Sequence, residues 1–328
     1  MKKKGIILFF LVVLLIFTAC GRSSGGRSGG GLINENFRVG SNGLVLRIIQ
    51  NNPPPRQFDD EPLNVLVEIH NDGATDLQDS EGFLFLSGFD PTLITGISTF
   101  GERIEELEGR DIDLPEGAFT VINLQANVRD LKSRNIETYS PNLLVTACYE
   151  YESIANPEVC IDGDPYSVTE TQKVCGVGQV TNFQSTQGGP VAVTSVKSEA
   201  SPRITRFEIT VENVGSGLAF KPGLTYLDKC NPYDPKGLDH NDINLVRVDE
   251  VKIGTVDIKS SCKPLENGML RIKSKNVGAV GGSLRGSGLM RCELRDISEP
   301  AFTTPLRIQL SYGYRDSVTR NVEIIQIP

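Results

Sequence analysis

The chain has 328 residues and a formal net charge of −8, with 39% hydrophobic residues, 33 Gly, 18 Pro and no Trp. This length allows two domains, and so much Gly and Pro suits short strands joined by many turns. The acidic balance excludes the basic surface that nucleic-acid binding requires, so we expect no nucleic-acid partner.

Residues 1–20 are typical of an export signal. Three lysines precede an apolar run of thirteen residues, which is too short to span a membrane as a helix. The sequence FTAC at residues 17–20 resembles the lipobox of prokaryotic lipoproteins, although Phe17 replaces the usual Leu. The resemblance implies cleavage before Cys20 and lipidation of that cysteine. An ordinary secretory signal cut near Ala19, or an uncleaved anchor, is the alternative.

Residues 21–36 (GRSSGGRSGGGLINEN) predict a Gly/Ser-rich tether, because they carry too little apolar surface to fold. Such a tether has an average end-to-end distance of roughly 20–25 Å. Without the three N-terminal lysines the chain carries a charge of about −11. An anionic membrane surface repels such a chain, so we expect that any attachment requires a covalent or inserted anchor.

Two stretches, residues 139–162 and 302–325, repeat each other 163 positions apart without a gap. In each, apolar residues alternate with polar ones through a Tyr-x-Tyr sequence, which predicts a strand with inward-facing rings. A polar turn and a short apolar return strand follow, so each stretch predicts a hairpin. The four rings belong to Tyr149, Tyr151, Tyr312 and Tyr314.

Three further blocks recur in the same order, which indicates a duplicated β-domain. A strand ends in Asn-x-Gly in both halves, residues 82–91 are echoed by 223–232, and residues 128–131 are echoed by 294–297. We therefore expect an all-β protein with domain 1 at residues 37–168 and domain 2 at residues 172–328. The Asn-x-Gly residues are Asn71 and Gly73, and Asn213 and Gly215.

An Asn-x-Gly strand end followed by a Tyr-x-Tyr strand resembles the tandem immunoglobulin-like modules of prokaryotic surface proteins, the CARDB-like group in particular. The resemblance covers both halves and implies two immunoglobulin-like β-sandwiches. Such modules usually serve binding, spacing or assembly, and they specify a fold more than an activity. Each expected domain exceeds the ~100 residues of an immunoglobulin sandwich, so insertions are implied.

Six cysteines follow the N-terminal one, and an even number in an exported chain predicts disulfides. Cys148 and Cys160 share the outer face of the expected hairpin, and both are absent from the second copy, so we expect them to pair. Zinc has little support because the chain has no C-x-x-C sequence and only two histidines. For the remaining four cysteines three pairings are open, and we favour Cys262–Cys292 and Cys175–Cys230.

Catalytic signatures are scarce. The sequence G-x-S-x-G occurs only within the Gly/Ser-rich tether (residues 21–30), which is not expected to form the strand-to-helix turn of a nucleophile elbow, and the phosphate-binding loop is missing. We therefore expect no enzymatic activity and no cofactor. Asp239, Asn241 and Asp242 bring together oxygen ligands that Ca²⁺ accepts, but they lack the EF-hand spacing. They form a weak calcium candidate, with a polar surface loop as the alternative, and no other metal site is expected.

We therefore expect an exported, lipid-anchored protein of the prokaryotic cell envelope that acts in display, adhesion or protein–protein interaction. Its expected partners are the membrane, through the lipid, and a surface protein or a further copy that adds to an exposed strand edge. Two alternatives remain. One is a structural subunit of a surface filament or layer, and the other is a hydrolase or ligand carrier that uses acids such as Asp239 and Asp242.

Overall fold

The computed structural model describes residues 37–167, 173–176, 178, 180–183, 186–274, 286–297 and 300–327. The expected signal, Cys20 and the tether lie outside these residues. Among them the regular secondary structure is almost entirely β, as predicted, and no helix is both long and apolar enough to cross a membrane. The helical pieces are η1 (Lys132–Arg134), α2 (Leu224–Cys230) and η2 (Lys259–Ser261).

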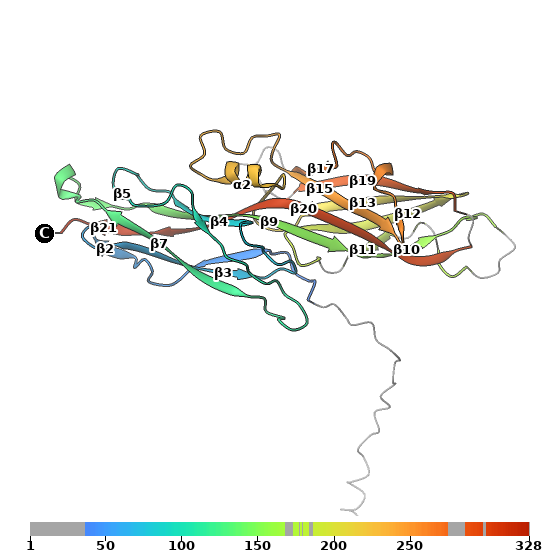
Figure 1. Ribbon diagram of the computed structural model, residues 1–328, viewed down its shortest axis with the longest axis horizontal. Helices are drawn as coiled ribbons and strands as arrows, with labels where there is room; N and C mark the ends of the chain where they lie inside the picture. The colour runs from blue at the N-terminus through green and yellow to red at the C-terminus, as the bar shows by residue number, and fades with distance from the viewer. Residues whose placement is uncertain are drawn as a thin grey trace, which may run out of the picture. The chain divides into compact units, whose positions relative to one another are not determined.

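The two repeated stretches pair with each other in the middle of the fold (Figure 1). Strands β9 (Asn142–Ala155) and β20 (Phe302–Asn321) run antiparallel without a register shift. The same register continues at both ends. There β10 (Glu158–Ile161) lies opposite the start of β20, and β8 (Thr138–Tyr139) lies opposite β21 (Glu323–Ile325). We call residues 138–161 the first ribbon and residues 302–325 the second ribbon.

The predicted hairpins are wrong. The expected return strands β10 and β21 do not fold back beside β9 and β20 but continue in the same direction. At the two bends Leu306 N donates to Pro157 O (2.8 Å) and Val322 N donates to Pro141 O (3.2 Å). Each ribbon thus forms its backbone hydrogen bonds with the other ribbon, and these bonds take the place of those that a hairpin would make.

The ribbons form the centre of a nine-stranded sheet, which we call the central sheet. A three-stranded sheet of β2, β21 and β8 continues from one end. The remaining strands of these sheets are β2 (Arg56–Phe58), β4 (Gly82–Ser87), β6 (Glu102–Arg103), β14 (Leu218–Phe220), β15 (Leu245–Ile253), β16 (Val256–Asp257) and β17 (Met269–Arg271).

Two smaller sheets, which we call the first and second covering sheets, pack on the face of the central sheet that carries the four tyrosines. The first covering sheet has the order β1-β3-β7-β5, and the second has the order β11-β12-β13-β19-β18. Their strands are β1 (Leu44–Ile48), β3 (Leu63–Asn71), β5 (Ile94–Thr95), β7 (Phe119–Val128), β11 (Val180–Asn182), β12 (Val191–Ser201), β13 (Ile204–Asn213), β18 (Lys273–Ser274) and β19 (Gly286–Arg295).

One hydrophobic cluster joins both halves. Inward residues of β3 such as Val67 and inward residues of β13 such as Ile209 belong to the same cluster as Leu310 of β20. Residues 36–328 also form one compact unit. The repeats therefore share a core instead of burying two separate ones, because the paired ribbons belong to both halves. The immunoglobulin-like resemblance of each half stays a prediction.

One of the expected repeated blocks, residues 82–91 with residues 223–232, is not a repeat in the structure. Residues 82–91 contain strand β4, whereas residues 223–232 contain helix α2. In the second half β15 takes the place of β4, since it pairs with β20 at the positions where β4 pairs with β9. Residues 221–244, which lie between β14 and β15, are therefore an insertion found in the second half only.

Candidate functional site

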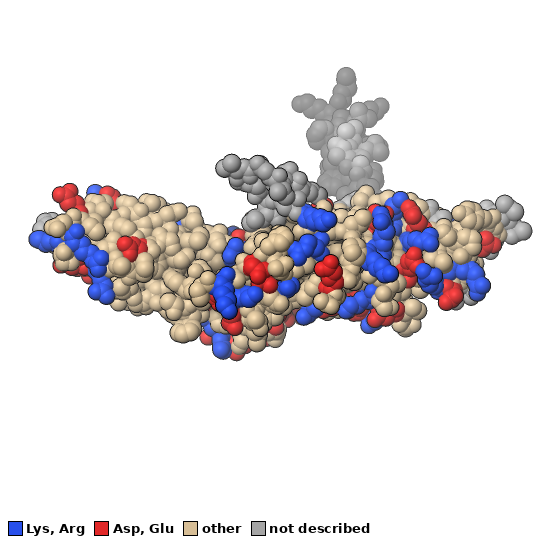
Figure 2. Space-filling view, turned by 90° about the horizontal axis from the view of Figure 1, so that it is seen from above, with Lys and Arg blue, Asp and Glu red and all other residues tan. Residues whose placement is uncertain are grey.

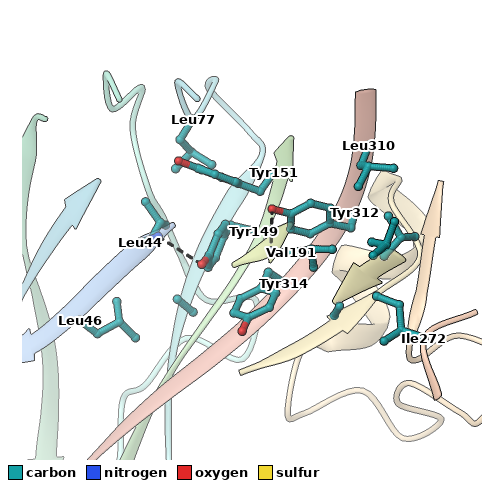
Figure 3. Packing of buried hydrophobic residues seen from close by; sticks show 14 of the residues in the cluster. Leu44, Leu46, Leu77, Tyr149, Tyr151, Val191, Ile272, Leu310, Tyr312 and Tyr314 are labelled. Carbon is teal, nitrogen blue, oxygen red and sulfur yellow. Dashed lines mark hydrogen bonds between the residues drawn. The ribbon is translucent and has the colours of Figure 1, made fainter. Parts of the chain in front are cut away.

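The four tyrosine rings meet where the ribbons pair (Figure 3). Tyr151 lies opposite Tyr312 and Tyr149 lies opposite Tyr314, with neighbouring ring centroids 5.8 to 6.4 Å apart. All four side chains are at most 3% exposed. The inward orientation predicted from the alternation is confirmed.

The first tyrosine of each ribbon holds the start of a strand in the covering sheet. Leu44 N, at the start of β1, donates to the Tyr149 hydroxyl at 3.2 Å. Val191 N, at the start of β12, donates to the Tyr312 hydroxyl at 3.3 Å (Figure 3). A buried N–H group is costly when it is unpaired, so these bonds fix how each small sheet docks on the central sheet.

The second tyrosine explains the Asn-x-Gly motif. The Tyr151 hydroxyl donates to Asn71 Oδ1 at 3.0 Å, and Asn71 also donates to Thr75 O at 2.9 Å, which closes the turn after β3. A Cβ atom on Gly73 would come within 1.9 Å of the Tyr151 hydroxyl, so only glycine fits beneath the phenol. The second half repeats this arrangement with Asn213, Gly215, Gly217 and Tyr314.

The tyrosine cluster serves the fold rather than acid–base chemistry. Burial raises the pKa of Tyr149, Tyr151 and Tyr312 above that of a free tyrosine, so these phenols stay neutral at physiological pH. Their hydroxyls are occupied by backbone and side-chain partners within the core. The cluster therefore presents no surface to a partner.

All six cysteines of the described part form disulfides, which indicates an oxidising, extracytoplasmic compartment. The expected Cys262–Cys292 bond is confirmed. The expected Cys148–Cys160 pair is wrong because β10 runs on from β9 instead of folding back beside it, and the pairing of Cys175 with Cys230 is wrong with it. The bonds present are Cys148–Cys230, Cys160–Cys175 and Cys262–Cys292.

The Cys148–Cys230 bond fixes the insertion to the face of the central sheet opposite the tyrosines. Cys148 is buried on β9, and Cys230 is the last residue of α2. Gly223 N, just before α2, donates to Glu150 Oε1 at 2.7 Å, which attaches the start of the helix to the same strand. The insertion thus covers part of a sheet face that would otherwise be open to water.

An aromatic groove lies between the insertion and β4. It is an open hollow of about 440 Å³, and Phe100 on its rim is 86% exposed. Asn231 Nδ2 donates to Thr99 O at 2.8 Å, and the Tyr233 hydroxyl donates to Leu86 O. The insertion is thus hydrogen-bonded both to the segment that contains Thr99 and to β4. The groove is lined by Phe83, Phe85, Thr99, Phe100, Leu227, Asp228, Asn231, Tyr233 and Asp234.

Two carboxylates give the groove a negative rim. Asp228 is exposed on α2. Hydrogen bonds from the backbone N–H groups of Gly237 and Lys236 lower the pKa of Asp234, so its side chain stays charged at neutral pH. Over the face seen in Figure 2, acidic and basic side chains are interspersed, so the aromatic surface distinguishes the groove more than net charge does.

Sequence reasoning did not find this groove, although one signal was present. Residues 83–86 read Phe-Leu-Phe-Leu, which is apolar on both faces of the strand. Leu84 and Leu86 point into the core, so the two phenylalanines require a cover on the other face. The insertion supplies that cover, and its position depends on a disulfide partner that sequence spacing does not specify.

A second hollow, of about 370 Å³, contains several acids. Burial raises the pKa of Glu150, which is also held by Gly223 N. Glu152 Oε2 accepts a hydrogen bond from Gln309 Nε2 at 2.8 Å. These two carboxylates are thus engaged with the fold. The hollow is lined by Thr75, Asp76, Gln78, Glu81, Glu150, Tyr151, Glu152, Arg247 and Ser311.

The calcium candidate is contradicted. Asp242 is 4% exposed, and its carboxylate contacts Lys229 Nζ at 2.7 Å and Lys221 Nζ at 3.6 Å. Burial acts to raise the pKa of Asp242, but the Lys229 hydrogen bond and further contacts outweigh it and lower that pKa. Asp239 instead accepts a hydrogen bond from Asn241 N. Two lysines therefore occupy the place of a cation, and no group of potential metal ligands occurs among the described residues.

No protein-family model matches the chain, and no curated protein matches its sequence. Function must therefore be argued from the geometry of the surface alone.

Proposed function

We propose that this is a non-enzymatic protein of the cell envelope, anchored by a lipid on Cys20, that displays the aromatic groove as a binding site. The proposal rests on the insertion at residues 221–244, which occurs in the second half only. Features that both halves share, such as the tyrosine bonds, serve the duplicated fold. The insertion and its disulfide occur in one half only, and together they build a hollow that exposes an aromatic side chain.

The lining of the groove specifies the chemistry of the partner. The exposed ring of Phe100 and the half-buried rings of Phe83 and Tyr233 favour an apolar or aromatic side chain, which loses its hydration when it packs against them. The carboxylates of Asp228 and Asp234 favour a neighbouring Lys or Arg. We therefore infer that the partner is a surface protein with an exposed segment in which an aromatic residue stands beside a basic one.

A peptide-display selection against residues 37–328 tests this proposal. Selected peptides should be enriched in aromatic residues next to Lys or Arg, and Phe100→Ser should weaken their binding at least tenfold by removing the most exposed ring. Asp228→Asn should weaken peptides with a basic residue more than neutral ones. Tyr166→Ser is the matched control, because Tyr166 is an exposed aromatic residue (73%) that lies after β10 and lines neither the groove nor the edge of β7. Selected peptides that are insensitive to Phe100→Ser would refute the groove as the binding site.

A further inference from the structure

Strand β7 has an open edge. It pairs with β3 along most of its length, whereas β5 covers only Asn127 and Val128 on its other side (Figure 1). Next to its two ends, Asn71 N donates to Ala118 O on the β3 side, and Arg129 N donates to Leu93 O on the other side. Because backbone groups alternate along a strand, even-numbered residues direct their N–H and C=O groups toward β3, and odd-numbered residues direct theirs toward the open edge. In the described part of the chain, no hydrogen bond reaches the backbone groups that residues 119, 121, 123 and 125 direct outward.

This edge lacks the usual protection against pairing. Natural edge strands carry charged side chains or proline, or they are covered by another element. Residues 118–128 (AFTVINLQANV) contain no charge and no proline. Phe119 and Val121 are 65% and 45% exposed on the outer face of the same strand. The edge therefore offers both unpaired backbone groups and apolar surface to an added strand.

We propose that β7 pairs antiparallel with β7 of a second copy, with the two-fold axis at Ile122. In this register Phe119 lies opposite Gln125 of the other copy, and Val121 lies opposite Asn123. All four outward-facing residues then form hydrogen-bonded pairs, and the arrangement is the same in both directions, as a two-fold interface requires. The first covering sheet of each copy becomes half of one continuous sheet.

The ends of β7 fit this length of pairing. At one end β5 occupies the edge from Asn127 onward, which stops the added strand. At the other end Gly117 has a φ of +74°, and its chain bends toward Asn71 on the β3 side, away from the open edge. The seven residues from 119 to 125 are thus available in each copy, and no element lies beside them in the sheet.

The flanking charges favour a second copy in the antiparallel orientation. The segment before β7 carries exposed acids, and the segment after it carries exposed bases. An antiparallel pair brings the acidic end of one copy toward the basic end of the other, whereas a parallel pair would bring like charges together. The acids are Asp111, Asp113 and Glu116, and the bases are Arg129, Lys132 and Arg134, with Asp130 among them.

The dimer is independent of the groove beside α2, which lies on the central sheet. An isologous contact closes on itself, so it gives a dimer that displays two grooves and does not by itself produce a filament. Two linked grooves bind a multivalent surface more tightly than one. The pairing can therefore fail while the groove binds its peptide, and the reverse also holds.

Sedimentation equilibrium of residues 37–328, which hold every described element of the fold, tests the pairing. We expect a monomer–dimer equilibrium. Asn123→Pro should raise the dimer dissociation constant at least tenfold, because the lost N–H faces the open edge in each copy and has no partner within one chain. Val121→Lys should act likewise, by placing like charges near the axis. Asn64→Lys is the control, since Asn64 lies on β3 and shares the outer face without being on the edge.

A spin label attached through Asn123→Cys tests the register. The two labels should lie within about 10 Å of each other in the dimer and broaden the spectrum, whereas labels at Asn64→Cys should lie more than about 20 Å apart and leave it sharp. Circular dichroism should show that every variant keeps its β-structure. A chain that stays monomeric at millimolar concentration, or a dimer that is insensitive to Asn123→Pro and shows no broadening at residue 123, would overturn the proposal. In the monomeric case any occupant of the edge would have to be a strand of another protein.

Discussion

At the scale of single residues, the hydroxyls of four tyrosines connect the layers. Tyr149 and Tyr312 each accept a hydrogen bond from the first N–H of a covering strand. Tyr151 and Tyr314 each donate to an asparagine that closes a turn. A phenylalanine would pack equally well at any of these positions but would leave buried polar groups unpaired. The hydroxyls therefore contribute specificity to the docking of the sheets.

This role predicts the effect of Tyr151→Phe. The substitution removes the acceptor of Thr75 N (3.3 Å) and the donor to Asn71 Oδ1, so the free energy of unfolding should fall by about 1–3 kcal/mol. Urea titration of the purified protein measures the change. Tyr166→Phe is the control because Tyr166 is 73% exposed. Equal stability of the two variants would show that the Tyr151 hydroxyl is dispensable.

At the scale of elements, the helical insertion depends on its disulfide. Helix α2 has seven residues and no side-chain hydrogen bond at its N-cap, so its intrinsic stability is small. It is held by the Cys148–Cys230 bond and by a small apolar cluster with Phe85, Phe220 and Leu227. The shape of the aromatic groove thus depends on a link between residues 82 positions apart.

Replacement of Cys148 and Cys230 together by alanine should therefore loosen the groove. The long loop closed by this bond implies a loss of about 2–4 kcal/mol in the free energy of unfolding. Amide hydrogen exchange in residues 224–230 should quicken. The control replaces Cys160 and Cys175, whose bond lies on β10 and should leave α2 unaffected. Unchanged exchange in α2 after loss of Cys148–Cys230 would mean that packing alone holds the insertion.

The elements also show what the sequence can and cannot specify. The alternation in β3, β13 and the Tyr-x-Tyr strands is a local property, so the strands and the buried rings were predicted correctly. The partner of each ribbon was not, because an edge of backbone N–H and C=O groups is chemically alike whichever strand it meets. The wrong hairpin then produced the wrong partner for Cys148. The aromatic groove was missed for a related reason, since it depends on which segment covers β4.

At the scale of the whole molecule, the duplication produced an internal two-fold contact rather than two separate domains. Residue 150 lies opposite residue 313, its equivalent 163 positions later, so the repeat relation and the strand register coincide. Each ribbon therefore presents the same side chains to its copy, as in a symmetric dimer. Residues 36–328 form one compact unit because this contact lies at the centre of the shared core.

The most direct measurement is a cross-link between the ribbons on the face opposite the tyrosines. Thr146 and Ser317 lie opposite each other, with their side-chain oxygens 3.0 Å apart. A chain with Thr146→Cys and Ser317→Cys should form an intramolecular disulfide on oxidation, seen as a fourth bond by mass spectrometry of the monomer. The control pair Thr146→Cys and Ser311→Cys should not, because Ser311 pairs with Glu152, roughly 20 Å further along β9. A bond in the first variant but not the second is the predicted result. No bond in the first variant, or equal bonding in both, would contradict the pairing of the two ribbons.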